Sequence, residues 1–272
     1  MIRKIVQWLV LLINNAYLAG FLSGRIYQGP FKYICVPGLN CYSCPGAVAS
    51  CPLGALQSML ASYQYRFTFY VTGLLMFFGL IFGRFVCGFL CPFGLLQELL
   101  HKIPFPRVKK LWKWLPRVKY IILVVFVLAM PALLRGDMGM GEPAFCKYIC
   151  PAGTLTAGLP LLIAVPEMRD AIGWLFYLKM TIALITVLGC LFVYRFFCKI
   201  MCPLGAFYGL FNKIALYRLK FSKENCTHCG DCSKACEMMT DPSRAPNSPE
   251  CIRCGDCVKA CRFSALKAEI FK

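Results

Sequence analysis

Long apolar stretches separated by more polar loops dominate the chain up to about residue 217. A helix needs roughly 20 residues to cross the hydrocarbon core of a bilayer, which is about 30 Å thick. The stretches that approach or reach this length are residues 5–24, 67–86, 120–134 and 173–197, the third being short and containing Pro131. The pattern therefore predicts a mainly α-helical integral membrane protein with four transmembrane helices.

Basic residues are concentrated in the loops on one side of the predicted spans. Arg3 and Lys4 precede the first span, and the loop after the second span carries Lys102, Arg107, Lys109, Lys110, Lys113 and Arg117. The loops on the other side, residues 25–66 and 135–170, are longer and carry fewer basic residues. The positive-inside rule then puts both termini in the cytoplasm. We expect a multi-pass protein of the inner cell membrane of a prokaryote, with the lipid bilayer as its first partner.

The composition agrees with a membrane protein, because 59% of the residues are hydrophobic and the mean hydropathy is +0.63. The formal net charge of +18 is compatible with nucleic-acid binding, but the basic residues lie beside the predicted spans rather than on an aromatic-studded soluble surface. We therefore expect no nucleic-acid partner. The 19 cysteines fall in groups beside proline and glycine, a distribution that favours metal ligation over a disulfide framework.

Residues 83–103 and 194–214 repeat one sequence pattern. The aligned pairs include Arg84 with Arg195, Cys87 with Cys198, Cys91 with Cys202, Pro92 with Pro203 and Gly94 with Gly205. The four spans are thus expected to form two pseudo-symmetric halves, as in membrane proteins whose sites lie between repeats. Further Cys-Pro-x-Gly elements begin at Cys51 and Cys150. Because proline suits the first helical turn, each element predicts a cysteine at a helix start, where the helix dipole favours an anionic cluster.

The spacing Cys-x2-Cys-x2-Cys-x3-Cys occurs at residues 226–236 and again at 251–261. In two-cluster ferredoxins the fourth cysteine of such a run binds the other cluster. The spacing therefore assigns Cys226, Cys229, Cys232 and Cys261 to one 4Fe-4S cluster, and Cys251, Cys254, Cys257 and Cys236 to a second. A pair of zinc sites is the alternative. We expect a membrane domain over residues 1–217 and an α+β bacterial 2[4Fe-4S] ferredoxin-like domain over residues 218–272.

The two Cys-x3-Cys-Pro elements of the repeat supply four thiols at equivalent ends of the two halves: Cys87, Cys91, Cys198 and Cys202. They predict a third 4Fe-4S cluster between the halves, which we call the inner site. The alternatives are a thiol pair for redox exchange or packing cysteines. Arg84 and Arg195 stand three residues before the first cysteine of each element, where they either stabilise a reduced cluster or extend to the membrane interface.

The loops on the other side hold six more cysteines: Cys35, Cys41, Cys44, Cys51, Cys146 and Cys150. By analogy with the inner site, Cys51, Cys146 and Cys150 are the better candidates for a fourth cluster, and either Cys44 or Cys41 completes the set. The remaining cysteines could form a disulfide or help to hold another centre, and a loop stapled by disulfides alone is the alternative. Asn14 and Asn15 in the first predicted span could hydrogen-bond a quinone or another helix.

The four spans, the Cys-x3-Cys-Pro elements at residues 87–92 and 198–203 and the terminal double motif resemble the NapH/NosR-type membrane-bound 4Fe-4S ferredoxin (polyferredoxin) family. The resemblance covers most of the chain. It implies electron transfer at the membrane, between a quinone pool or a cytoplasmic donor and a partner redox protein. The chain departs from the family by its cysteine-rich loop at residues 35–51 and by Cys146-x3-Cys150, and we expect it to work without the large flavin domain of NosR-like members.

We expect the protein to relay electrons through several 4Fe-4S clusters from a cytoplasmic donor to an extracytoplasmic or quinone partner. Its redox partners would be a ferredoxin, a flavoprotein or reductase subunits. Two alternatives remain open at this point. One is an electron-transfer subunit of a quinol dehydrogenase that works only on the cytoplasmic side. The other is a factor that reduces a metal ion during cofactor assembly.

Overall fold

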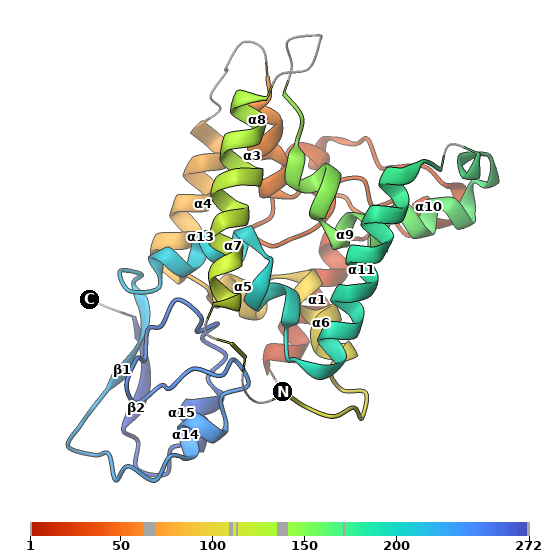
Figure 1. Ribbon diagram of the computed structural model, residues 1–272. Helices are drawn as coiled ribbons and strands as arrows, with labels where there is room; N and C mark the ends of the chain where they lie inside the picture. The colour runs from red at the N-terminus through yellow and green to blue at the C-terminus, as the bar shows by residue number, and fades with distance from the viewer. Residues whose placement is uncertain are drawn as a thin grey trace.

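The computed structural model describes residues 2–62, 69–108, 111–112, 114–134, 141–170 and 172–270. Helices make up most of the described chain before residue 217, which we call the helical part. The rest, residues 217–270, contains two strands and two short helices and lies at one end of the molecule, in blue in Figure 1. The prediction of a mainly helical protein with an α+β C-terminal part is confirmed.

The first predicted span, residues 5–24, is not one helix. Helix α1 (Ile2–Asn14) ends ten residues early, and the short helix α2 (Ala19–Ser23) follows after a break. At the break the Asn15 side chain donates back to Leu11 O, and the Tyr17 amide donates to Gly46 O instead of continuing the helix. The hydrophobic pattern missed this because the competing acceptor lies in a distant loop.

Two helices in the described chain are long and apolar enough to cross a membrane, residues 115–133 and 174–192. The first is continuous through four segments: η2 (Leu115–Arg117), α7 (Val118–Ile122), the π-helical η3 (Leu123–Ala129) and α8 (Met130–Leu133). The second is α11 (Trp174–Phe192). Only 28% and 17% of their apolar windows are buried, so most of this surface faces outward. Helix α4 (Phe69–Phe82) is shorter than the span predicted there, whose residues 67–68 are not described.

Each Cys-Pro-x-Gly element begins a helix, as predicted. Helices α3 (Pro52–Leu60), α6 (Pro92–Leu100) and α13 (Pro203–Phe211) have Cys51, Cys91 and Cys202 as their N-caps. Cys150 caps a continuous helix made of α9 (Pro151–Gly153), the π-helical η5 (Thr154–Gly158) and α10 (Leu159–Ala164). The first turns of these helices are buried, so all four cysteines lie inside the protein.

The sequence repeat is a structural repeat as well. Helix α5 (Phe85–Phe89) leads into α6 in one half, and α12 (Phe196–Ile200) leads into α13 in the other. The remaining helical segments of the helical part are the 3-10 turns η1 (Pro30–Tyr33) and η6 (Pro166–Arg169) and the π-helical η4 (Phe145–Ile149). Three basic residues of the loop after the second predicted span lie outside the described residues: Lys109, Lys110 and Lys113.

The C-terminal part is built on one antiparallel strand pair. Strand β1 (Tyr217–Phe221) pairs with β2 (Leu266–Ile270), with Tyr217 opposite Ile270 and Phe221 opposite Leu266. Helices α14 (Asp231–Lys234) and α15 (Asp256–Ala260) lie between the strands in sequence and beside each other in space (Figure 1). Helix α14 follows Cys229 and helix α15 follows Cys254, the second cysteines of the two Cys-x2-Cys-x2-Cys-x3-Cys motifs.

A buried carboxylate joins α1, α6 and the second repeat. Glu98 is 4% exposed and accepts hydrogen bonds from Arg195 Nε at 2.9 Å and Tyr194 Oη at 2.7 Å, and it also pairs with Lys4. Burial alone would raise the pKa of Glu98, but the charges of Arg195 and the other nearby cations hold that pKa at about 2. Glu98 is therefore ionised and neutralises basic groups from two distant segments.

We predict that Glu98→Gln destabilises the fold by about 3–5 kcal/mol, because it leaves the buried Arg195 guanidinium without its counter-charge. The measurement is the midpoint of chemical unfolding in detergent. The matched control is Glu269→Gln, which removes an exposed ion pair with Lys220 and should cost less than about 1 kcal/mol. Equal effects of the two substitutions would contradict the prediction.

Candidate functional site

The cysteines of the double motif line two pockets in the predicted groups. Cys226, Cys229, Cys232 and Cys261 line a cavity of about 300 Å3, which we call the distal site. Cys236, Cys251, Cys254 and Cys257 line a narrower pocket, which we call the proximal site. The fourth cysteine of each run thus lies with the first three of the other run, which is the arrangement that two 4Fe-4S clusters require.

Left-handed backbone positions shape the two loops in the same way. His228 and Gly230 have φ values of 55° and 78°, and Arg253 and Gly255 have φ values of 54° and 82°. In each loop these residues flank the second cysteine of the run. Glycine adopts this conformation without steric cost, and the repeated reversal lets three closely spaced cysteines face one centre. His228 therefore serves loop geometry beside the distal site.

The inner site brings together one thiol pair from each half. Cys87, Cys91, Cys198 and Cys202 are all at most 7% exposed. Cys87, Cys91 and Cys202 belong to one buried core, and Cys198 Sγ accepts a hydrogen bond at 3.1 Å from Gln97 of the helix that Cys91 begins. The Gly205 amide at the start of α13 donates to Cys202 Sγ at 3.3 Å. The repeat therefore places the four predicted thiols around one buried centre.

Arg84 and Arg195 cross between the halves and are fully buried, so the alternative in which they extend to the membrane interface is wrong. Arg84 Nη2 donates to Cys198 O at 3.0 Å, and Arg195 Nη1 donates to Cys87 O at 2.5 Å. Each guanidinium passes over the glycine of the opposite helix start, since a Cβ on Gly205 or Gly94 would lie 3.2 Å from it. The two arginines thus hold each half against the other beside the inner thiols.

Cys41, Cys51, Cys146 and Cys150 line a second cavity in the helical part, of about 380 Å3, and we call this group the outer site. Cys41 Sγ would lie 3.5 Å from a Cβ on Gly153, and Cys146 Sγ 3.8 Å from one on Gly54, so each thiol lies over the helix start of another cysteine. Cys44 is beside Cys41 but does not line this cavity, and Cys35 lies apart, paired by its backbone with Ser50. No disulfide joins the described cysteines.

The cysteine loop at residues 35–51 packs directly against the inner site. The Tyr208 hydroxyl donates to Pro37 O at 3.0 Å, and a Cβ on Gly38 would lie 2.6 Å from Leu90 O. Tyr208 is fully buried and belongs to the same core as Cys51 of the outer site and Cys87, Cys91 and Cys202 of the inner site. One aromatic side chain therefore packs in the core that the inner and outer sites share.

The C-terminal part is hydrogen-bonded to the helical part around Cys251. Arg84 donates to Pro249 O at 2.7 Å and to the Glu250 carboxylate at 2.9 Å. Asn212 donates to Cys251 O at 2.8 Å, and Arg253 donates to Phe82 O at 2.9 Å. These bonds put the proximal site against the inner site and leave the distal site on the far side.

One buried core passes through three of the four cysteine groups. It contains cysteines of the inner and outer sites together with Ile252, and Cys236 and Cys254 of the proximal site pack against it. A second, smaller core joins Cys257 and Cys251 of the proximal site to Cys232 of the distal site. The four sites are therefore connected in series through packed side chains.

The donor sets fit four-iron clusters better than single ions. Among the described residues, no three His, Cys, Asp or Glu side chains converge as they would around one metal ion. A 4Fe-4S cluster takes one thiolate on each iron, so its four cysteines surround a cage and do not meet at a point. The outer, proximal and distal groups of four thiols line cavities in this way, and the four inner thiols are buried together. Binding of a cluster by each group is part of the proposal below.

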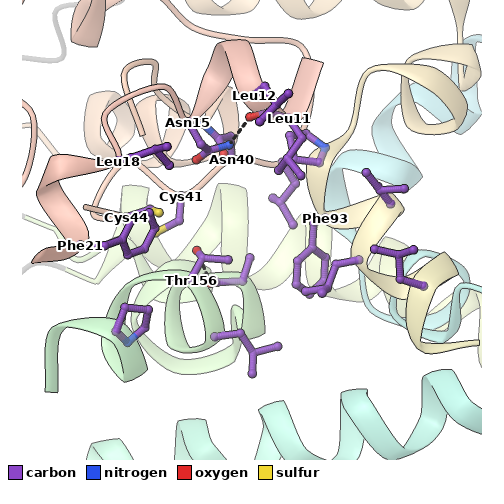
Figure 2. Close-up of a pocket in the computed structure, with 18 residues that line it drawn as sticks. Leu11, Leu12, Asn15, Leu18, Phe21, Asn40, Cys41, Cys44, Phe93 and Thr156 are labelled. Carbon is purple, nitrogen blue, oxygen red and sulfur yellow. Dashed lines mark hydrogen bonds between the residues drawn. The ribbon is translucent and has the colours of Figure 1, made fainter. Parts of the chain in front are cut away.

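An apolar cavity of about 410 Å3 lies beside both sites of the helical part (Figure 2). Helix α1, the loop at residues 39–44, the start of α6 and the helix at residues 151–164 enclose it. Its polar lining groups are Asn15, Asn40 and Thr156, together with the thiols of Cys41 and Cys44. Phe93, two residues after Cys91, forms part of its wall.

Sequence reasoning missed the polar residues that support these sites: Gln57, Gln97, Glu98, Asn212 and Glu250. For Gln57 and Gln97 a sequence signal was present, because the pattern Cys-Pro-x-Gly-x-Leu-Gln occurs at residues 51–57 and again at 91–97. Gln57 and Gln97 are at most 1% exposed. Each donates its amide to a cysteine sulfur.

Two family models match the chain. A 4Fe-4S binding domain matches residues 66–114, 120–163 and 175–224, and a 4Fe-4S dicluster domain matches residues 218–262. The matches to the first model cover the inner cysteines and also Cys146 and Cys150. The second covers both runs of the double motif. No solved structure matches the chain.

Curated relatives cover much of the chain. The methylamine utilization ferredoxin-type protein MauN of Paracoccus denitrificans is 30% identical over 81% of this chain and 72% of its own length. An uncharacterized protein of Methanocaldococcus jannaschii is 33% identical over 59% of this chain, which spans 61% of that relative. The regulatory protein NosR of Pseudomonas aeruginosa is 30% identical over 59% of this chain and 21% of its own length.

We predict that Gly88→Ala loosens the contact between the C-terminal and helical parts, because the added Cβ would lie 2.6 Å from Ile252 O. Hydrogen exchange should become faster in residues 248–254. The control is Gly73→Ala, where nothing lies within 4 Å of the new Cβ. Unchanged hydrogen-exchange protection in Gly88→Ala would show that the close contact of Gly88 with Ile252 O does not limit packing of the C-terminal part on the helical part.

Proposed function

Because the chain belongs to the NapH/NosR-type family of membrane-associated, ferredoxin-type 4Fe-4S electron transport proteins, we propose that it carries electrons along four clusters in series. The order is distal, proximal, inner and outer. The observation that carries the proposal is the continuous packing of the four cysteine groups, with Cys251 held against the inner site and Tyr208 in the core that the inner and outer sites share.

In this proposal the distal site exchanges electrons with a soluble partner. Cys229 is the one exposed cysteine among the 19. The partner would be a ferredoxin, a flavoprotein or a reductase subunit. The proximal site then passes electrons to the inner site across the contact made by Arg84, Asn212 and Arg253. When clusters are bound, they supply the one-electron chemistry, and the protein holds them close enough for electron tunnelling.

We further infer that the helical part, residues 1–217, lies in the inner membrane with its termini and the ferredoxin-like domain, residues 218–272, on the cytoplasmic side. The exposed apolar surfaces of α4, α7–α8 and α11 would face lipid. The helices that follow Cys51 and Cys150, whose first turns are buried, would be re-entrant and draw the outer site toward the inner one. Electrons would then leave on the extracytoplasmic side or to a quinone.

A second candidate, that the protein exchanges electrons with a quinone, is favoured by the cavity in Figure 2. A quinone ring is apolar and planar and carries carbonyl oxygens that accept hydrogen bonds. The cavity has apolar walls and a few polar side chains, and it lies next to both Phe93 of the inner site's helix and Cys41 of the outer site. A quinone bound there would be in reach of either cluster.

We predict that the anaerobically purified protein holds about sixteen irons, four per cluster, and that Cys41→Ser and the double variant Cys146→Ser/Cys150→Ser each hold about twelve. Iron and acid-labile sulfide content, together with EPR of the reduced protein, measure this. The matched control is Cys44→Ser, which alters a thiol beside Cys41 that does not line the outer cavity and should keep about sixteen.

About twelve irons in the wild type and in all of these variants would mean that the outer cysteines bind no cluster. The path would then end at the inner site. Loss of a cluster in Cys44→Ser but not in Cys41→Ser would reverse the choice between these two cysteines.

For the quinone candidate, we predict that Leu96→Trp slows cluster reduction by a water-soluble quinol at least tenfold, because the indole fills part of the cavity, while iron content is unchanged. Anaerobic stopped-flow absorbance measures the rate. The control is Leu188→Trp on the exposed surface of α11, which should reduce at the wild-type rate. Equal rates in the two variants would argue against a quinone in this cavity.

A further inference from the structure

Two buried glutamines make the same set of contacts at different sites. Gln97 Nε2 donates to Cys198 Sγ at 3.1 Å, and its Oε1 accepts from the Cys198 amide at 3.3 Å. Gln57 Nε2 donates to Cys146 Sγ at 3.3 Å, and its Oε1 accepts from the Phe145 amide at 2.9 Å. Each carboxamide thus joins a sulfur to the backbone of the same short segment.

The two glutamines hold equivalent positions. Each is the sixth residue after the cysteine that caps its helix, Cys51 for Gln57 and Cys91 for Gln97. Each side chain also donates to the carbonyl four residues earlier, Leu53 O or Phe93 O, at 3.3 Å. That bond fixes the amide so that its nitrogen faces the opposite cysteine.

The other two helices that start at a cysteine have no glutamine at this position. Thr156 follows Cys150 at the same spacing, and its hydroxyl donates to Ala152 O. Tyr208 follows Cys202 at that spacing, and its hydroxyl donates to Pro37 O. Each site of the helical part therefore has one glutamine amide, and in each site it meets the first cysteine of a Cys-x3-Cys-Pro element.

We propose that Gln57 and Gln97 are positioning residues that set the reduction potentials of the outer and inner clusters by donating an N–H to one ligand sulfur in each. The inference rests on the proposed function, because it needs clusters at both sites. The chain's own residues act here through a ligand and do not touch the iron.

The physical reason is the charge of the cluster. Reduction adds one negative charge, part of which resides on the cysteine sulfurs, and a fixed N–H donor stabilises the more negative state more strongly. Hydrogen bonds to the sulfurs are among the factors that set cluster potentials. Cys198 is buried and Cys146 is partly buried, so water has little access to either sulfur, and each glutamine should make its cluster easier to reduce.

The test uses the full chain, purified anaerobically, with an EPR-monitored redox titration and an iron assay on each variant. Gln97→Leu should lower the midpoint potential of one helical-part cluster, and Gln57→Leu should lower that of the other. The expected change is up to about tenfold in the reduction equilibrium, which is roughly 59 mV for a one-electron couple. The control is Gln7→Leu, a buried glutamine that donates to Gly88 O and Glu98 Oε1 and not to a sulfur, and it should shift neither potential.

Gln57→Met and Gln97→Met cover the case in which leucine causes loss of a cluster. Methionine is unbranched and similar in length to glutamine and has no hydrogen-bond donor, so these variants should retain iron and show the same lowered potential. Full iron content with unshifted potentials in the leucine or methionine variants would overturn the inference and leave the four-cluster path intact. About eight irons in the wild type would overturn both, because no cluster would lie near either glutamine.

Discussion

The reciprocal bonds of Arg84 and Arg195 are the constraint on which the helical part depends. Each guanidinium is buried and ends on the backbone carbonyl of the other half's first cysteine. A buried cation needs a counter-charge, and Glu98 and Glu250 supply one to each arginine. Repeat pairing, thiol placement and docking of the C-terminal part therefore share one network of charges.

Backbone conformation and glycine make this network possible. The arginines fit only because Gly94 and Gly205 leave space above the helix starts that carry Cys91 and Cys202. At the outer site the same glycine positions, Gly54 and Gly153, face thiols. The outer site thus repeats the plan of the inner site, with sulfur in the space that the guanidinium groups occupy at the inner one.

Features carried by local spacing or by the repeat could be predicted from the sequence. The two cysteine groups of the C-terminal part follow from spacing, and the convergence of Cys87, Cys91, Cys198 and Cys202 follows from the repeat. The position of Cys41 in the outer site could not be predicted, because the loop at residues 35–51 takes its conformation from distant contacts with Tyr208 and Leu90. The break after α1 has a similar cause, since Tyr17 bonds to Gly46. Which thiols bind iron stays a prediction.

The contact of Arg84 with Glu250 also has a consequence for biosynthesis. The two residues are 166 positions apart, so the ribosome makes the arginine long before its carboxylate. Until the C-terminal part emerges and docks, the first half contains a cation with no counter-charge, and its buried state is unfavourable. Completion of the helical core is thus coupled to a segment synthesised much later, and a chain that stops before residue 250 would expose this defect to cellular quality control.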